Sequence, residues 1–352
     1  MSKSKILSFV KNIFFLIPIV AIAAFSCKKS DYPTVKTSAV KIDTGVSISQ
    51  IHIKTTISAA DGSPDYSLLG FGYDVNGAYA DSSSVRAKVI DADAFLHDNP
   101  ERFGLSHSTM GSDPIVYAND AEDFSSSLSS GLTETTGLKV FRGSITDYFT
   151  NADALSGKYF YSSLSITIVM KRLAMDVNPD LVKNYLTATF KQDVVTLSAE
   201  ALVNKYGTHV LTSMQFGGTM HALYRAETSL TDRRKPAIEG LRFAVKRIFG
   251  FSTGELDPVD SAVLASVHSP AIAYHVVGGD LSKFQVVKYP KFTFLSAVDW
   301  SNTVTADNAA FMGFGRDPLL PLDQLISDPV KQAAVKSYIA TFISANSVKV
   351  TN

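Results

Sequence analysis

The stretch that decides the fold runs from Leu202 to Met220 and reads LVNKYGTHVLTSMQFGGTM. It begins inside an amphipathic helix expected from about Ser198 to Tyr206, because apolar residues recur there at helical spacing. Those residues are Ala199, Leu202, Val203 and Tyr206. Gly207 stands where a helix favours a left-handed cap residue. Thr208 and His209 then lead the chain into a strand.

Two adjacent glycines follow in the strand region. Strands are expected from His209 to Phe216 and from Thr219 to Glu227, with Gly217 and Gly218 interrupting the strand between these two parts. Paired glycines weaken a strand and mark a bend, a bulge or the close approach of another backbone. On the residue pattern alone, this region is a kinked strand.

The rest of the chain mixes helices and strands. Asn178-Pro179-Asp180 supplies a helix cap, a proline at the first helical position and an acid in the first turn. Asp328-Pro329 begins a last helix, whose apolar side is expected to hold Val330, Ala333, Ala334 and Phe342. Further strands are expected at 46–57, 68–75, 160–170 and 271–277. This mixture lacks regular alternation, so it favours an α+β fold with an antiparallel sheet. We expect one domain over 45–346 and a short tail over 347–352.

Several of these residues resemble a known signature. Tyr206-Gly207-Thr208-His209 after an amphipathic helix, with Gly217-Gly218 in the next strand, is similar to the signature of the membrane-attack-complex/perforin (MACPF) superfamily. Leu69–Val75 resembles the first-strand region of bacterial members. Gly278-Gly279 resembles the glycine pair that ends the fourth strand, and Leu320–Ile326 resembles the closing segment. The likeness is to bacterial MACPF lipoproteins of the Bacteroidota type.

The resemblance implies a bent, twisted four-stranded antiparallel sheet flanked by two helical clusters, as in MACPF proteins and cholesterol-dependent cytolysins. In lytic members those clusters unfurl into membrane-spanning hairpins, and a ring of subunits makes a β-barrel pore. The glycine pairs Gly217-Gly218 and Gly278-Gly279 would act as hinges, and His209 would be a structural or hinge residue. The chain departs from the pattern at Val210 and Ala199, where the family often has aromatic residues.

Two stretches are candidates for the inserting hairpins. The first, from about Asn119 to Lys158, is rich in Ser, Thr and Gly, and its charges are mainly acidic. The second, from about Thr228 to Ser269, begins with a basic run. A basic amphipathic helix can lie on a membrane surface, although such a run is more often a solvated face.

Leu241 to Phe251 fits both a helix and a membrane strand. As a helix, it places Leu241, Val245, Ile248 and Phe249 on one face. Read as a strand, its apolar side holds Leu241, Phe243, Val245, Phe249 and Phe251. About ten alternating residues suffice for a tilted barrel strand. Arg247 falls on the apolar side and is the weak point of the strand interpretation.

The N-terminus resembles that of a bacterial lipoprotein. Basic residues precede an apolar stretch from about Ile13 to Ala24, which is too short for a comfortable membrane span but fits a secretory signal. Small residues then lead to Cys27, the only cysteine in the sequence. We therefore expect a signal peptide over 1–26, acylation of Cys27 with chains such as palmitate, and a lipidated tether over 27–44. The expected location is the outer membrane, anchored by lipid and facing the cell surface.

Composition and motifs argue against several functions. Lys plus Arg number 33 and Asp plus Glu number 33, so overall charge indicates no nucleic-acid partner. A single cysteine excludes intramolecular disulfides and a thiolate metal site. The sequence has no phosphate-binding loop, no HExxH motif and no histidine pair at metal-ligand spacing. No catalytic residue, cofactor or metal site is predicted, and an enzyme would need a site assembled only in space.

Two functions agree with these features of the sequence. The first is pore formation against competing bacteria or host cells, through homo-oligomers that meet a target membrane or surface receptor. The alternative is a non-lytic surface protein that keeps the fold for adhesion or ligand binding. The expected domain fills the chain, whereas many lytic relatives carry an added C-terminal module for target recognition; this favours the alternative.

Overall fold

Four long antiparallel strands form the central sheet. The computed structural model describes residues 34–35, 45–51, 68–112, 114–250, 258–290 and 293–352, all within one compact unit. The long strands are β5 (Phe103–Ser112), β7 (Tyr159–Met175), β9 (Ser213–Thr228) and β10 (Val267–Val277). They lie in the order β10-β9-β7-β5. The α+β class and the antiparallel sheet are confirmed.

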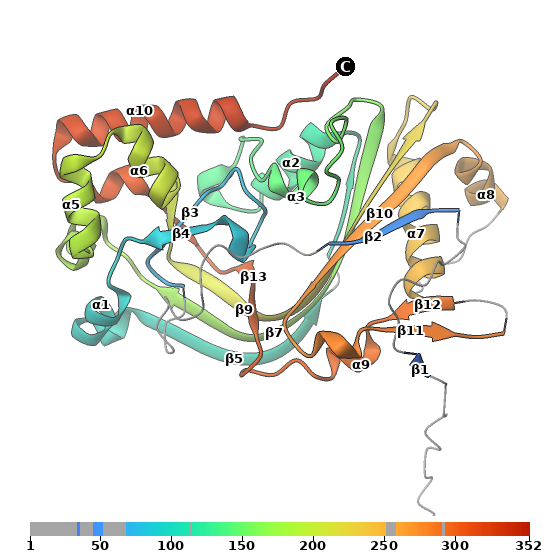
Figure 1. The fold of residues 1–352 in the computed structure, drawn as a ribbon, viewed down its shortest axis with the longest axis horizontal. Helices are drawn as coiled ribbons and strands as arrows, with labels where there is room; N and C mark the ends of the chain where they lie inside the picture. Colours follow the sequence, from blue (N-terminus) through green and yellow to red (C-terminus); the bar gives the residue numbers. More distant parts are fainter. Residues whose placement is uncertain (1–33, 36–44, 52–67, 113, 251–257, 291–292) are drawn as a thin grey trace, which may run out of the picture. The chain divides into compact units, whose positions relative to one another are not determined.

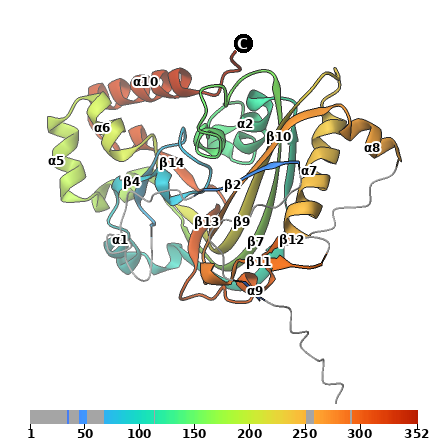
Figure 2. The same ribbon diagram turned by 45° about the vertical axis from the view of Figure 1, so that its right-hand side comes forward.

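Three short strands extend this sheet. β2 (Ser47–Gln50) pairs parallel with β10 at one edge. β6 (Ile115–Ala118) pairs with β7, and β13 (Ala310–Phe314) pairs with the N-terminal part of β9. The long strands curve strongly along their length in both ribbon views (Figures 1 and 2).

Alternating side chains let helices cover both faces of the sheet. On one face, Tyr161, Leu223 and Ala273 pack under α2 (Ala121–Ser129) and α3 (Gly143–Thr146). On the other face, Phe160, Tyr224 and Ile272 pack under α7 (Arg234–Phe249), and α8 (Pro258–Leu264) adjoins α7. Successive strand residues point to opposite faces, so both apolar clusters come from the same strands. Figure 1 shows α2 and α3 on one side of β10 and α7 on the other.

A third apolar cluster supports the ends of β7 and β9. It packs a small sheet of order β14-β8-β3-β4 against several helices. The strands are β3 (Phe71–Tyr73), β4 (Val85–Lys88), β8 (His209–Leu211) and β14 (Leu319–Pro321). The helices are α1 (Ala92–Asp98), α4 (Pro179–Val182), α5 (Ala188–Thr196), α6 (Ala199–Tyr206) and α10 (Pro329–Asn346). The remaining elements are β1 (Thr34–Val35), β11 (Gln285–Lys288), β12 (Thr293–Ser296) and α9 (Val298–Ser301).

Three local expectations differ from the structure. β9 runs without a break through Gly217 and Gly218, because it pairs with β7 along its whole length. No helix was expected where α5 lies. The buried side of α10 holds Val335 and Ile339, whereas Val330 is 79% exposed.

Within the described residues, no helix combines the length and apolar character that a bilayer-spanning helix needs. The expected signal peptide, Cys27 and the tether to residue 44, apart from β1, lie outside the described residues. The outer-membrane location therefore stays a prediction.

Candidate functional site

The signature tetrapeptide lies where α6 turns into β8. Gly207 has a φ of +77°, which favours glycine, and its N–H donates to the Val203 carbonyl at 2.8 Å. A Cβ on Gly207 would overlap the Tyr73 carbonyl of β3. Both the backbone angle and the close approach of β3 therefore require a glycine at position 207.

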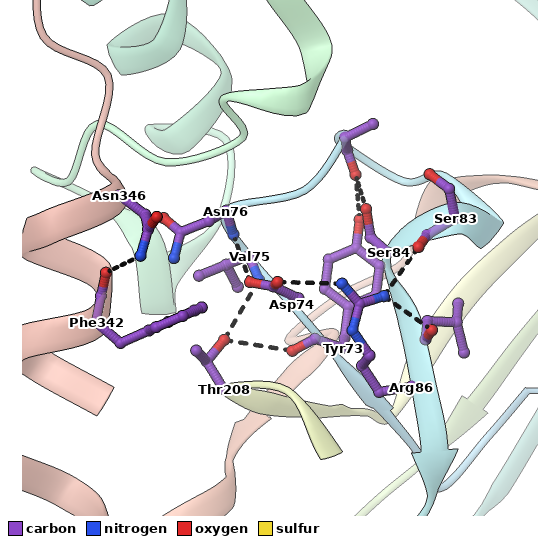
Figure 3. A network of polar contacts seen from close by, with 12 residues as sticks. Tyr73, Asp74, Val75, Asn76, Ser83, Ser84, Arg86, Thr208, Phe342 and Asn346 are labelled. Carbon is purple, nitrogen blue, oxygen red and sulfur yellow. Dashed lines mark hydrogen bonds and ion pairs between the residues drawn. The ribbon is translucent and has the colours of Figure 1, made fainter. Parts of the chain in front are cut away.

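Thr208 links three strands of the small sheet. Its N–H donates to the Tyr73 carbonyl at 2.9 Å, and its hydroxyl accepts from the Val75 N–H at 3.3 Å. Figure 3 shows Thr208 between these two groups of the β3 chain. On the other side, the Leu322 N–H donates to the Thr208 carbonyl at 3.1 Å. The signature thus joins β8 to the chain around β3 and β14.

His209 is 4% exposed and lies beside Thr208. Its Nδ1 is 2.9 Å from the Thr208 hydroxyl oxygen. Burial lowers the pKa of His209 to about 4, so the ring is neutral at neutral pH. This environment suits a packed structural residue, and a hinge role for His209 stays a prediction.

Tyr206 packs against α5, a helix that was not expected from the residue pattern. Its ring contacts Phe190 edge-on at 4.9 Å, and its hydroxyl donates to Asp193 Oδ2 at 2.5 Å. Lys205 pairs with the same carboxylate, and this contact, followed by that of Tyr206, lowers the pKa of Asp193. The only local signal for α5 was Thr187, which caps it. Phe190 and Asp193 therefore belong to the surroundings of the signature.

The two glycine pairs meet in space. Gly217 and Gly218 lie in β9, and Gly278 and Gly279 follow β10 with φ values of +70° and +67°. A Cβ on Gly278 would overlap the Gly217 carbonyl. The Trp300 indole N–H donates to the Gly278 carbonyl at 2.8 Å, which ties α9 to this glycine cluster.

Close packing explains why both β9 positions are glycine. A Cβ on Gly217 would overlap the Ile168 carbonyl of β7, and a Cβ on Gly218 would lie 2.5 Å from Val304 Cγ2. The β7–β9 register shifts between Val169 and Lys171, beside Gly217. The pair thus marks close approach at an irregularity in the sheet, which was one interpretation of the sequence. No contact here tests the hinge role itself.

Both candidate hairpin segments connect neighbouring strands of the central sheet. We call residues 119–158 the first segment; it lies between β6 and β7 and carries α2 and α3. We call residues 229–266 the second segment; it lies between β9 and β10 and carries α7 and α8. The segments cover opposite faces of the sheet.

In α7, the expected helical face is buried against the sheet. Leu241, Val245, Ile248 and Phe249 are at most 1% exposed. A Cβ on Gly240 would lie 2.7 Å from the Tyr224 ring, so the helix approaches β9 closely. Phe243 is half-buried, and Phe251 lies outside the described residues. The structure describes the helical state of this stretch only.

Charged and titratable side chains of the sheet face the first segment. Arg225 of β9 is 5% exposed and lies between the rings of Phe149 and Tyr159, at 4.2 and 4.3 Å from their centroids. His221 of β9 lies directly opposite His275 of β10, and its ring contacts Tyr148 at 5.1 Å. Sequence spacing hid this cross-strand histidine pair.

In the described part of the chain, no group of three or more His, Cys, Asp or Glu side chains could hold a metal ion. The hydrogen bonds of Thr208 join the chain around β8, β3 and β14, and Arg225 packs between the rings of Phe149 and Tyr159. Both residues therefore connect separate parts of the fold.

Comparisons with known proteins agree with this geometry. The MAC/Perforin domain model matches residues 102–244, which include β5, the first segment, the signature and most of α7. GNIP1Aa from Chromobacterium piscinae superposes with a TM-score of 0.59 at 17% identity, over 81% of this chain and 57% of that one. A candidate cell-invasion protein with a MAC/Perforin domain from Bacteroides thetaiotaomicron gives 0.62 at 15% identity, over 89% and 63%. No curated protein matches the sequence significantly.

The chain spans less than two thirds of the length of both solved relatives, at 57% and 63%. At these identities the likeness shows the fold alone, and the domain model matches the central strands and the signature. Residues 102–244 therefore resemble a MAC/Perforin domain, and the chain has the α+β fold of bacterial proteins with that domain.

Proposed function

We propose that this protein attacks the membranes of competing bacteria or host cells by assembling into rings and inserting β-hairpins. It would do so as a lipoprotein of the outer membrane, held at the cell surface through acylated Cys27. The proposal requires no enzymatic group, cofactor or nucleic acid.

One observation carries the proposal. Each segment begins and ends on neighbouring antiparallel strands, the first between β6 and β7 and the second between β9 and β10. Each can therefore extend an existing hairpin without any change in the order of the sheet. A membrane strand needs about ten residues, so each segment is long enough for two strands and a turn.

Insertion exchanges one burial for another. The apolar side chains of α7 now pack against β7, β9 and β10. As a strand, about half of them would face lipid and the polar residues between them would face a water-filled lumen. Part of the apolar burial lost when α7 leaves the sheet would thus be regained in the bilayer.

Dye release from liposomes tests the proposal, with negative-stain imaging for rings. Two variants in α7 sharpen it. Phe243→Lys puts a charge on the lipid-facing side, where a charge costs up to about 2–4 kcal/mol at the bilayer centre and less toward an interface, so release should fall. Lys246→Gln changes an exposed residue on the lumen side and should leave release near the parent level.

If the parent protein releases no dye but still binds cells or a surface ligand, the non-lytic alternative holds. Equal release by Phe243→Lys and the parent would contradict insertion of α7 in this register.

A further inference from the structure

The residues after α10 lie against the first segment. Figure 1 shows the chain leaving α10 and running toward α2 and α3. Val348 is fully buried and belongs to the apolar cluster of that segment, with Phe124, Ile145 and Phe149. We call Val348–Thr351 the C-terminal strap.

Hydrogen bonds made by backbone groups of the strap attach it at three places along the first segment. The Val348 N–H donates to the Lys139 carbonyl at 2.8 Å, in the middle of the segment. The Val350 N–H donates to Glu122 Oε1 in α2 at 2.9 Å. The strap therefore bridges parts of the segment that are distant in sequence.

The third attachment is at the end of the segment. The Thr351 N–H donates to the Leu155 carbonyl at 3.0 Å, and the Gly157 N–H donates to the Thr351 carbonyl at 2.8 Å. A Cβ on Gly157 would lie 2.8 Å from Val350 Cγ1, so the two chains are closely packed. These bonds form a parallel bridge between Thr351 and Ser156.

The helix that precedes the strap, α10, packs against a different part of the fold. Val335 and Ile339 of α10 are buried in the cluster that surrounds the signature, where α10 packs on α6. The strap thus connects a helix that the proposed insertion leaves in place to a segment that must leave the sheet.

We infer that the C-terminal strap holds the first segment in its packed helical state, and that the strap must detach before this segment can insert. The inference rests on the proposed function for the insertion step, whereas the holding role concerns the soluble protein alone. Extension of residues 119–158 into two paired strands leaves Glu122 and Leu155 near each other at the base of the hairpin, but carries Lys139, in the middle of the segment, to its tip. The strap cannot stay bonded to all three, so it raises the barrier to extension.

Glu122 contributes charge to this attachment. It pairs with Lys139, and this contact, followed by the Val350 N–H, lowers the pKa of Glu122. The carboxylate that accepts from the strap therefore remains ionised in mildly acidic solution.

Hydrogen exchange on the full chain in detergent tests the holding role. Val348→Ala removes buried methyl groups and keeps the backbone bonds. Amide exchange in residues 119–158 should accelerate by about tenfold or more, with α5 and α6 unchanged. Val330→Ala is the matched control, because Val330 lies on α10 but is 79% exposed. Unchanged exchange, or a uniform rise over the whole chain, would overturn the inference.

A reversible lock tests the detachment step. Lys139→Cys with Val348→Cys, in a chain that also carries Cys27→Ala, places a thiol on each of the two residues joined by the 2.8 Å hydrogen bond in the middle of the segment. Oxidation should slow dye release at least about tenfold, and reduction should restore it. Equal release in both redox states contradicts a need for detachment. If the parent protein itself releases no dye, the proposed function fails, and the exchange experiment alone decides the holding role.

Discussion

At the scale of single residues, His221 makes stability depend on pH. Burial, with a smaller contribution from His275, lowers its pKa from 6.5 to about 4. Its Nδ1 atom is buried without a hydrogen-bond partner among the described residues. The imidazole ring contacts the ring of Tyr148 edge-on. The Asp81 carboxylate lies 3.9 Å from His275 Nε2. Burial, followed by the charge of Asp81, raises the pKa of Asp147. Below pH 6.5 the unfolded chain takes up a proton on this histidine that the folded chain resists.

The His221 contribution to stability is therefore complete above about pH 6.5 and is lost as the pH falls toward 4. Between pH 7 and 5 the loss should be about 2 kcal/mol. In His221→Leu, urea unfolding should show a correspondingly smaller loss over this interval. His268→Leu, at an exposed position of the same sheet, should keep the parent's pH dependence. A parent-like pH dependence in His221→Leu would contradict the assignment.

The β9 glycines give a second prediction at this scale. In Gly217→Ala the new methyl group meets a backbone carbonyl, which cannot move cheaply, so unfolding should be easier by about 2–3 kcal/mol. Gly111→Ala in β5 is the control, because its Cβ would lie 3.7 Å from the nearest atom, in ordinary contact. Denaturant titration of both variants decides this. A neutral Gly217→Ala would mean that the sheet is looser here than the packing implies.

At the scale of elements, α7 is expected to change its period when the protein binds a membrane. Ala244 is fully buried in the helix, whereas Phe243 is half-buried. In the inserted strand Phe243 would face lipid and Ala244 would face the lumen. Single cysteines from Leu241 to Phe251 in Cys27→Ala protein, labelled with an environment-sensitive dye, should report helical burial in solution and alternation on liposomes. A helical period retained on membranes would rule out insertion of this element.

Local signals predicted some elements well and others poorly. The cap Ser198 and the apolar face of α6 are sequence-local, and the helix appears at Ala199–Tyr206. In α5 only Phe190 is buried and Val195 is 80% exposed, so the helix has no apolar face that residue spacing could predict. In α10 the helix was correct and Phe342 packs against the core as expected, but Val330 is exposed and the buried residues are Val335 and Ile339. Neighbouring elements decide between such faces.

At the scale of the whole molecule, attachment to the membrane is expected to depend on one residue. Cys27→Ala should remove the site of acylation, and the protein should become soluble or stay unprocessed in the envelope. Detergent-phase partitioning measures this, and protease treatment of whole cells reports whether the domain faces outward. Partitioning like that of the parent would show that another feature holds the protein at the membrane.

The sequence by itself determined the class of fold, the signature at Tyr206–His209 and the extents of both candidate segments, because these depend on residues close together in the chain. Only the tertiary structure decided that the glycine pairs meet, that His221 faces His275 and that Val348–Thr351 fastens residues 119–158. Each of these contacts joins residues far apart in sequence. Their partners are set by sheet register and chain path, which depend on burial summed over many strands.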